Sequence, residues 1–246
     1  MNINQHNLSR TIPAKVKFEI RKNSGYGCVI CGTGIIEYEH VNPDFKDCRE
    51  HNPEKMTLLC PTCHSKKTRG FLSVETIERA MKNPKPKQLG FSKEVLDIGD
   101  KSPKIIFAGS LIIQCPVPIM VSNIPIIRIL PPENDESPFR LSAIFFNSKG
   151  EITLKIIDNE WFSYSSNWDL EVKAGKIIIS DSKNQLNLIL KIVDSETIEI
   201  ELIESLIGDI YIKGNGKELI VKNLKTGIEN TFVNCISSHS QVGFSL

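Results

Sequence analysis

Residues 28–69 read CVICGTGIIEYEHVNPDFKDCREHNPEKMTLLCPTCHSKKTR, and two C-x-x-C pairs bracket most of this segment. The first pair is Cys28 and Cys31, and the second is Cys60 and Cys63. Two residues between cysteines let a tight turn direct both sulfur atoms at one ion, and two such turns complete a tetrahedral four-thiolate site for Zn²⁺. We predict a structural zinc ion here, because four thiolates leave no open position for water or substrate. Two unrelated pairs, or a redox-active C-x-x-C, are the alternatives.

The remaining cysteines, Cys48, Cys115 and Cys235, lack metal-ligand spacing and are expected to be ordinary thiols. Residues 1–15 are polar and lack the apolar core of a secretory signal. We therefore expect a cytoplasmic protein, in which seven cysteines do not indicate a disulfide framework.

One strongly apolar stretch, residues 105–130, is long enough to cross a bilayer as a helix. Its prolines at positions 116, 118 and 125 would interrupt such a helix repeatedly. Gln114 and Arg128 would also place polar groups in lipid. This stretch is therefore predicted to form successive buried strands, with no membrane partner.

The segment between the cysteine pairs contains two candidate strands. Residues 37–43 have alternating character and end at a proline, so they predict a strand that leads into a loop. Residues 56–59 form a short apolar run suited to a second strand, and residues 61–68 can form a helix with proline in its first turn. This order brings His40, at the end of the first strand, and His64, on the helix, into one small cleft.

Two histidines and a carboxylate in one cleft can hydrolyse a phosphodiester bond. The reaction needs a base to deprotonate water and a cation to neutralise the charge that builds on the phosphoryl group. A histidine can be that base at neutral pH. A second histidine and a carboxylate can hold one Mg²⁺ or Mn²⁺ ion, or Ni²⁺ or Zn²⁺, with positions left for phosphate and water. The alternative is that His40 and His64 only pack, or make supporting hydrogen bonds, in a zinc finger.

Three stretches resemble the HNH endonuclease family, a ββα-metal fold with paired zinc knuckles: C-V-I-C-G, E-H-V-N-P and L-L-C-P-T-C-H-S-K-K-T. They occur in the family's order and span about a sixth of the chain. The resemblance implies that His40 is the general base and that His64 coordinates a catalytic divalent ion. It further implies that Glu39 is the second ligand of that ion.

One position departs from the family pattern. The family usually has an asparagine five residues before the third zinc cysteine, where it positions the catalytic loop, and this chain has Lys55 there. His51 is our first candidate for the middle residue and Asn52 the second. Lys55 is also the chief reason to consider an alternative function, that of a catalytically inactive, zinc-stabilised nucleic-acid-binding protein.

Basic residues near the motif are candidates for contacts with a phosphate backbone, and a solvated basic face is the alternative. Residues 1–100 contain 16 Lys and Arg against 12 Asp and Glu, an excess of +4, whereas residues 101–246 contain 14 against 17, a balance of −3. The basic excess thus lies with the proposed nuclease. The candidates are Lys66, Lys67 and Arg69 after His64, and Arg21 and Lys22 in residues 13–22, which are expected to form a helix, or else a strand.

The expected fold class is α+β, with a zinc-bound ββα-metal domain at 1–83, a proline-rich linker at 84–100 and a mostly β domain at 101–246. Ser73 is expected to cap a helix before the linker. Beyond residue 101, runs rich in Ile, Leu and Val recur at intervals of about 8–12 residues between turn residues, which is typical of a sandwich, barrel or short solenoid. Trp161 and Trp168 are expected to be packing anchors, or else part of a ligand surface.

The function expected from these features is metal-dependent hydrolysis of DNA, with RNA a less favoured substrate because the motif addresses phosphate and reads no base. The slightly acidic β-rich domain is expected to contact a protein partner or to form a homo-oligomer. By analogy alone, the setting is a bacterial restriction or antiviral defence effector.

Overall fold

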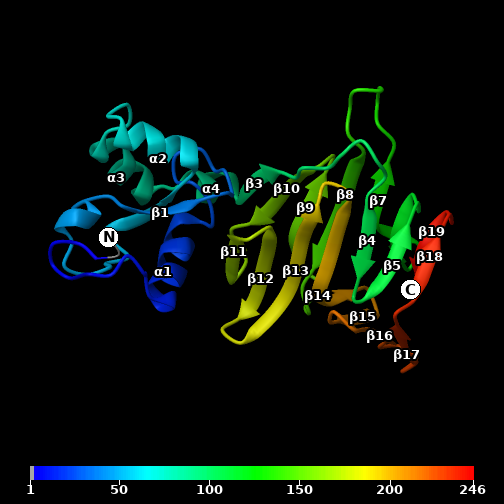
Figure 1. The fold of residues 1–246 in the computed structure, drawn as a ribbon. Coiled ribbons are helices and arrows are strands. Elements are labelled where there is room, and N and C mark those ends of the chain that lie inside the picture. Colours follow the sequence, from blue (N-terminus) through cyan, green and yellow to red (C-terminus); the bar gives the residue numbers. More distant parts are fainter. Residues whose placement is uncertain (1–2) are drawn as a thin grey trace. The chain divides into compact units, whose positions relative to one another are not determined.

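A computed structural model describes residues 3–246, which divide into two compact units. Within the described residues, the first unit comprises 3–94 and Tyr164–Leu170, and the second comprises Val95–Ser163 and Glu171–Leu246. The chain is mixed α+β and mostly β, as the sequence predicts (Figure 1). The first unit therefore includes a short segment from the C-terminal half of the sequence.

The first unit contains a two-stranded antiparallel sheet followed by a helix. Glu37 of β1 pairs with Leu59 of β2, and His40 pairs with Met56, so both strands fall where the sequence predicts them. The elements of this unit are α1 (Ala14–Ser24), β1 (Glu37–His40), the 3-10 helix η1 (Phe45–Asp47), β2 (Met56–Leu59), α2 (Pro61–Thr68), α3 (Val74–Lys82), α4 (Lys85–Leu89) and β3 (Phe91–Val95).

Local sequence explains where the helices begin and end. Ser73 accepts a hydrogen bond from the Thr76 amide at 3.2 Å and caps α3, as expected. Helix α1 ends at Gly25, whose φ of 71° suits glycine because a Cβ atom would be strained there. Residues 84–100 are not a simple linker, because they contain α4 and β3. Pro84 and Pro86 lie at the N-cap and in the first turn of α4, where a missing amide proton costs nothing.

Two small apolar clusters form the core of the first unit. One lies where α1 packs against β2 and has Ile12, Ile20, Met56 and Leu58 as its buried members. The other surrounds the cysteines and includes Val29, Val41, Leu59 and Ile77. Residues of β1 and β2 thus pack against α1 and against the cysteine cluster.

Arg21 is buried inside the first unit and does not present its charge to solvent. Its guanidinium donates to Asp169 Oδ1 at 2.8 Å and Oδ2 at 2.5 Å, and to the Tyr38 hydroxyl at 2.8 Å. Burial lowers the pKa of Arg21, but the hydrogen bonds and charges of Asp169 and Tyr38 together raise it by more, so its pKa lies above the usual value. Arg21, predicted to contact nucleic acid, thus has its charge paired within the unit, with a carboxylate that lies 148 residues away in sequence.

The segment Tyr164–Leu170 makes two further contacts within the first unit. The Tyr26 hydroxyl donates to the carbonyl oxygens of Asn167 at 2.8 Å and Trp168 at 2.7 Å. The Trp168 ring lies 4.6 Å, centroid to centroid, from that of Phe18. Trp168 is therefore a packing anchor, as expected.

The second unit consists of β-strands arranged in two sheets (Figure 1). One sheet has the order β19-β6-β7-β8-β9-β10, and the other runs in sequence order from β11 to β17, with β4 parallel to the start of β14. A buried hydrogen bond of 3.2 Å joins Thr153 of one sheet to Asn187 of the other. Trp161 is buried in this unit, as expected of a packing anchor.

The strands of the second unit alternate buried and half-buried residues, as sheets with one covered face do. Arg140–Phe146 shows this alternation along its whole length. Among residues 3–246, no helix is long and apolar enough to span a bilayer, and the apolar stretch at 105–130 forms four strands. The strands are β4 (Lys104–Phe107), β5 (Ser110–Ile113), β6 (Val117–Val121), β7 (Ile124–Leu130), β8 (Arg140–Phe146), β9 (Ile152–Ile157), β10 (Glu160–Tyr164), β11 (Asp169–Lys173), β12 (Lys176–Ser182), β13 (Gln185–Asp194), β14 (Thr197–Ile207), β15 (Ile210–Gly214), β16 (Glu218–Asn223), β17 (Glu229–Val233), β18 (Ile236–Ser238) and β19 (Val242–Ser245).

Replacing Asp169 with alanine would leave the buried Arg21 charge without its carboxylate. We expect a loss of about 3–5 kcal/mol in the free energy of unfolding, the range for breaking one side of a buried ion pair. Urea denaturation followed by circular dichroism measures it. The control is Glu196→Ala, which removes an exposed ion pair with Lys101 and should leave the midpoint unchanged. Equal effects of the two substitutions would contradict a buried role for Asp169.

Candidate functional site

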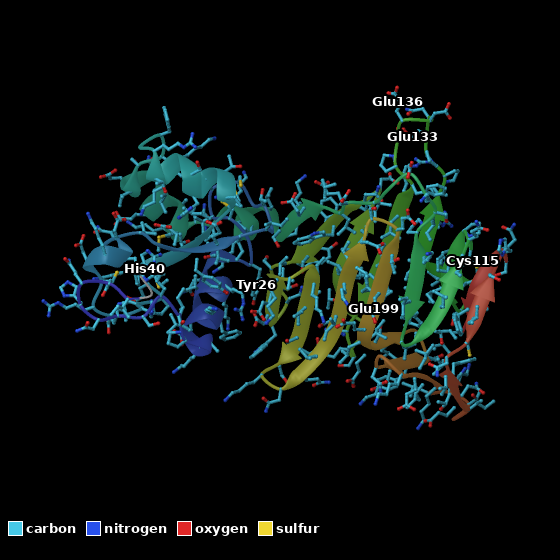
Figure 2. All side chains as sticks on the ribbon, in the orientation of Figure 1. Tyr26, His40, Cys115, Glu133, Glu136 and Glu199 are labelled. Atoms are coloured by element: carbon cyan, nitrogen blue, oxygen red, sulfur yellow. The ribbon has the colours of Figure 1, made fainter. Side chains whose placement is uncertain are left out.

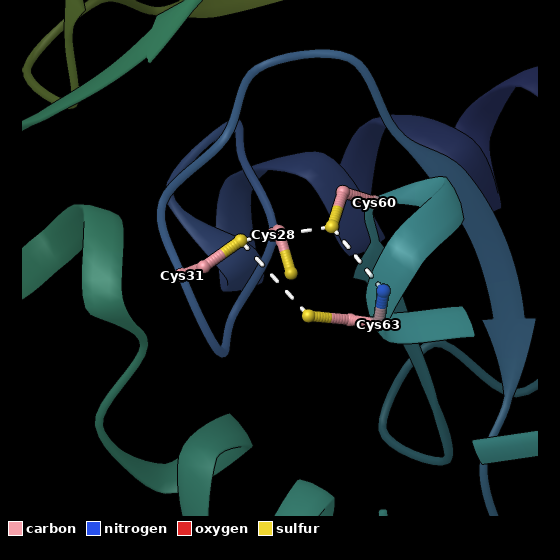
Figure 3. A group of neighbouring side chains, drawn as sticks. All are labelled: Cys28, Cys31, Cys60 and Cys63. Atoms are coloured by element: carbon pink, nitrogen blue, oxygen red, sulfur yellow. Dashed lines mark hydrogen bonds between the residues drawn. The ribbon is translucent and has the colours of Figure 1, made fainter. Parts of the chain in front are cut away.

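The four cysteines of the two C-x-x-C pairs converge on one point. Their sulfur atoms all lie within 4.8 Å of one another, with Cys31 Sγ at 3.6 Å from Cys60 Sγ and 4.0 Å from Cys63 Sγ (Figure 3). Four thiolates bound to a tetrahedral Zn²⁺ at about 2.3 Å lie about 3.8 Å apart. The donor set and its spacing therefore fit one metal ion, consistent with structural zinc.

The cysteines of the cluster differ in how their surroundings shift the pKa of each thiol. Its sulfur atoms sit close together in an apolar surrounding, with only Cys31 exposed. The hydrogen bond between Cys28 and Cys31 lowers the pKa of Cys31 to about 4, and a hydrogen bond with Thr33 adds to this effect. The same Cys28–Cys31 hydrogen bond raises the pKa of Cys28, as does burial. A bound cation would favour the thiolate form of all four ligands.

His64 projects from α2 and lies between two carboxylates of β1. Its Nδ1 atom is 3.0 Å from Glu37 Oε2, and its Nε2 atom is 2.8 Å from Glu39 Oε2. The two glutamates occupy alternate positions of β1 and so project from the same face of the strand. Sequence reasoning missed Glu37, although the E-Y-E spacing places it beside Glu39 on that face.

Lys67 holds Glu39 from the other side and is not available to a phosphate. Its ammonium group donates to Glu39 Oε1 at 2.5 Å, to Asp44 Oδ1 at 2.6 Å and to the carbonyl oxygen of His40 at 3.1 Å. All three of its donors therefore have partners. Burial lowers the pKa of Lys67, but the bonds to Asp44 and Glu39 raise it by more. Lys67, predicted to contact nucleic acid, thus has its charge paired with Glu39 and Asp44 in the structure.

His40 lies at the end of β1 and forms a hydrogen-bonded chain with His51. Its Nε2 atom is 3.0 Å from His51 Nδ1, and His51 Nε2 is 2.8 Å from the carbonyl oxygen of Ser9. A carbonyl oxygen only accepts, so His51 Nε2 must carry a proton, and in a neutral His51 the Nδ1 atom accepts from His40. His40 Nδ1 then keeps a free lone pair. Sequence reasoning did not identify Ser9, which acts through its backbone and leaves no signal in the sequence.

The His40 ring is neutral at pH 7. Burial, followed by the charges of His51, Lys67 and Arg10, lowers the pKa of His40 to about 4. The exposed fraction of the residue is 8%. A neutral ring can accept a proton, and the same surroundings make it a weaker base than an exposed histidine.

One cleft brings the candidate catalytic groups together. It has a volume of about 270 Å³ and is lined by Glu37, Glu39, His40 and His64, with Arg10 and Phe45 among its other walls. Figure 2 labels His40, which lies in the first unit. The structure therefore places the two histidines and the carboxylate predicted from sequence in one cleft, and it adds Glu37 to them.

Asn52 and Lys55 lie in the loop between β1 and β2, outside that cleft. Asn52 Oδ1 accepts from the Glu54 amide at 2.9 Å, so its side chain orders the loop locally. Lys55 is exposed, and its carbonyl oxygen accepts from the Val41 amide at 3.0 Å. Both residues line a second hollow of about 430 Å³ on another side of His40. His51, and not Asn52, is the residue of this loop that contacts His40.

Three of the five predicted phosphate-binding residues are exposed: Lys22 on α1, Lys66 on α2 and Arg69 after it. Lys66 and Arg69 line a shallow hollow of about 460 Å³ together with Phe71. Neither makes an ion pair with any residue in the described part of the chain, 3–246. These two residues remain candidates for a phosphate contact.

No family model, curated protein or solved structure matches this chain.

Replacing Cys60 with serine should abolish zinc binding, because a neutral hydroxyl is a poor substitute for a thiolate ligand. We expect about one zinc ion per chain in the native protein and close to none in Cys60→Ser, with a lower melting temperature because metal binding contributes to folding. Elemental analysis after gel filtration, together with thermal unfolding, measures both. Cys235→Ser is the control and should keep its zinc. Full zinc content in Cys60→Ser would contradict the four-cysteine site.

Proposed function

We propose that this protein is a metal-dependent, HNH-like endonuclease that hydrolyses phosphodiester bonds, with DNA favoured over RNA. The observation that carries the proposal is the single cleft that contains His40, His64 and Glu39, beside a four-cysteine metal cluster. The order of β1, β2 and α2 is compatible with a ββα-metal arrangement. The shared cleft of His40, His64 and Glu39 supports the roles that the family resemblance implies for them.

His64 and Glu39 are the residues that would hold a divalent cation. Among residues 3–246, only the four cysteines form a cluster of three or more convergent ligands, so this second site would have two protein ligands. The 2.8 Å between His64 Nε2 and Glu39 Oε2 fits neighbouring ligands of an octahedral ion, which lie about 3.0 Å apart for bonds of about 2.1 Å. When bound, Mg²⁺ or a similar ion would neutralise charge on the phosphoryl oxygens.

The general base in this proposal is His40, acting through Nδ1. As water attacks phosphorus, Nδ1 accepts the proton that the water loses, and the ring becomes an imidazolium ion. His51 stabilises that ion through the 3.0 Å contact with Nε2. The Ser9 carbonyl fixes the tautomer of His51, and so His51 is a positioning residue for His40.

The second candidate function is a zinc-stabilised nucleic-acid-binding protein without catalysis. The observation that favours it is Lys55, where the family usually has asparagine. An exposed lysine in the hollow beside His40 can contact phosphate and does not need a catalytic ion.

Replacing His40 with alanine distinguishes the two functions. We expect wild-type protein to nick plasmid DNA with Mg²⁺ or Mn²⁺ and the His40→Ala variant to be about 10²- to 10⁴-fold slower, the usual contribution of a general base. Both proteins are assayed with full zinc content, with and without added divalent ion. His239→Ala is the control, because His239 lies in the second unit and should not affect the rate.

Two results would contradict the nuclease. One is equal cleavage by wild type and His40→Ala, which would indicate a contaminating nuclease. The other is retained DNA binding with no cleavage by wild type under any divalent ion, which would favour the binding protein.

Replacing His51 tests whether that residue orients His40. We expect His51→Ala to reduce cleavage about 10- to 100-fold, the usual effect of removing an orienting partner. His51→Gln should retain more activity, because its side-chain oxygen can still accept from His40 Nε2. Initial rates of plasmid nicking at matched zinc content measure both variants. If Gln and Ala are equally impaired while both stay folded, His51 does not act through this hydrogen bond.

A further inference from the structure

Phe71 is the most exposed of the large hydrophobic residues in the described part of the chain, with 83% of its surface accessible. It follows α2 directly and is the apolar wall of the hollow that Lys66 and Arg69 also line. An aromatic ring exposed to water does not contribute the stabilisation that it would provide if it were buried. The exposed Phe71 ring is therefore available to stack on a partner.

The end of α2 holds Phe71 in place without burying its ring. The Phe71 amide donates to the Lys66 carbonyl at 2.8 Å and the Gly70 amide to the Lys67 carbonyl at 3.0 Å, with Gly70 at a φ of 78°. This is the Schellman arrangement, in which the residue at the Phe71 position usually packs against the last turn. Here Leu72 packs into the core instead. The backbone is thus fixed while the Phe71 ring remains free.

The hollow beside Phe71 has the chemistry of an anion site. Lys66 and Arg69 provide two positive charges, and the hydroxyls of Thr62 and Ser65 provide further donors. No acidic side chain lines this hollow. In contrast, Lys67 on the same helix is already neutralised by Glu39 and Asp44.

We propose that this hollow binds one unpaired nucleotide of a nucleic-acid strand, with the phosphate on Lys66 and Arg69 and the base stacked on Phe71. A phosphate matches the two cations, and a base matches an exposed aromatic ring, which stacks on any base without reading its sequence. A simple inorganic anion would leave Phe71 unexplained, and an apolar peptide would leave the two cations unpaired.

The hollow lies on a different face of α2 from the proposed active site. His64 and Lys67 contact β1, whereas Lys66 and Arg69, three positions apart, share another face of the helix. The nucleotide bound there would flank the scissile bond and not contain it. The substrate of the proposed nuclease would then be a strand with an unpaired region. The link between this nucleotide site and cleavage rests on the proposed function.

Fluorescence anisotropy tests the site directly, with a labelled single-stranded oligonucleotide and its duplex. Binding is measured on full-length, zinc-replete His40→Ala protein, so that no cleavage occurs and no chelator is needed. Into this background we introduce Phe71→Ala, the pair Lys66→Ala and Arg69→Ala, and the probe Phe71→Trp. Matched controls are Ile35→Ala, another exposed apolar residue of the first unit, and the pair Lys183→Ala and Lys217→Ala, two exposed lysines of the second unit.

We expect Phe71→Ala to weaken single-strand binding about 5- to 150-fold, the range for losing one base–aromatic stack, and to change duplex binding little. The double charge variant should reduce the salt dependence of single-strand binding by about 0.7 in slope, the contribution of the one phosphate that Lys66 and Arg69 share. Tryptophan at position 71 should restore affinity, and its emission should be quenched by the bound strand. Neither control should change the affinity.

Unchanged single-strand affinity in Phe71→Ala, or unquenched emission from Phe71→Trp in the bound protein, would overturn the inference. If wild type nicks plasmid while Phe71→Ala binds normally, this inference fails and the proposed function stands. If Phe71→Ala loses single-strand binding although wild type never cleaves, the nucleotide site stands and the nuclease fails.

Discussion

Convergence of four thiolates on one point is the constraint on which the first unit depends. The cysteines lie in two segments, one that precedes β1 and one that joins β2 to α2, so a shared ion would fix the hairpin and the helix relative to each other. The two apolar clusters of this unit are small, and an ion of this type contributes about 10–16 kcal/mol in isolated fingers. Glu39 and His40 on β1 and His64 on α2 are therefore positioned by a ligand set that performs no chemistry itself.

The carboxylates of the cleft are paired with basic side chains, and one of these, Lys67, was expected from the sequence to contact phosphate. Glu39 lies between Lys67 and His64, and Glu37 contacts the opposite edge of the His64 ring. Such a chain directs the Glu39 Oε2 atom towards His64 Nε2. The same bonds remove Lys67 from the phosphate-binding surface. The exposed positive charge among the predicted phosphate-binding residues is then that of Lys66, Arg69 and Lys22, which lie outside the cleft.

Features set by local sequence could be predicted, and features set by distant partners could not. The bounds of β2 and α2, the cap at Ser73 and the cysteine cluster follow from short patterns of spacing, turn residues and apolar runs. Arg21 has an ordinary basic sequence context, and nothing near it indicates that Asp169, 148 residues later, neutralises it. The ion pairs of Lys67 with Glu39 and Asp44 likewise depend on the folded arrangement and not on the residues next to it in sequence. The position of Glu37 beside Glu39 could have been predicted, because residues two apart in a strand project from the same face.

The departure at Lys55 bears on whether the cleft can be active. An asparagine there would hold the catalytic loop through its side chain, and this chain holds the same loop by other bonds. The Lys55 carbonyl accepts from Val41, the Lys55 amide donates to the Asn52 carbonyl at 3.0 Å, and the Asn52 side chain accepts from Glu54. His51 then supplies the contact to His40. Because the loop is ordered and its histidine reaches the proposed base, the substitution changes which residue positions His40 and does not by itself remove that positioning.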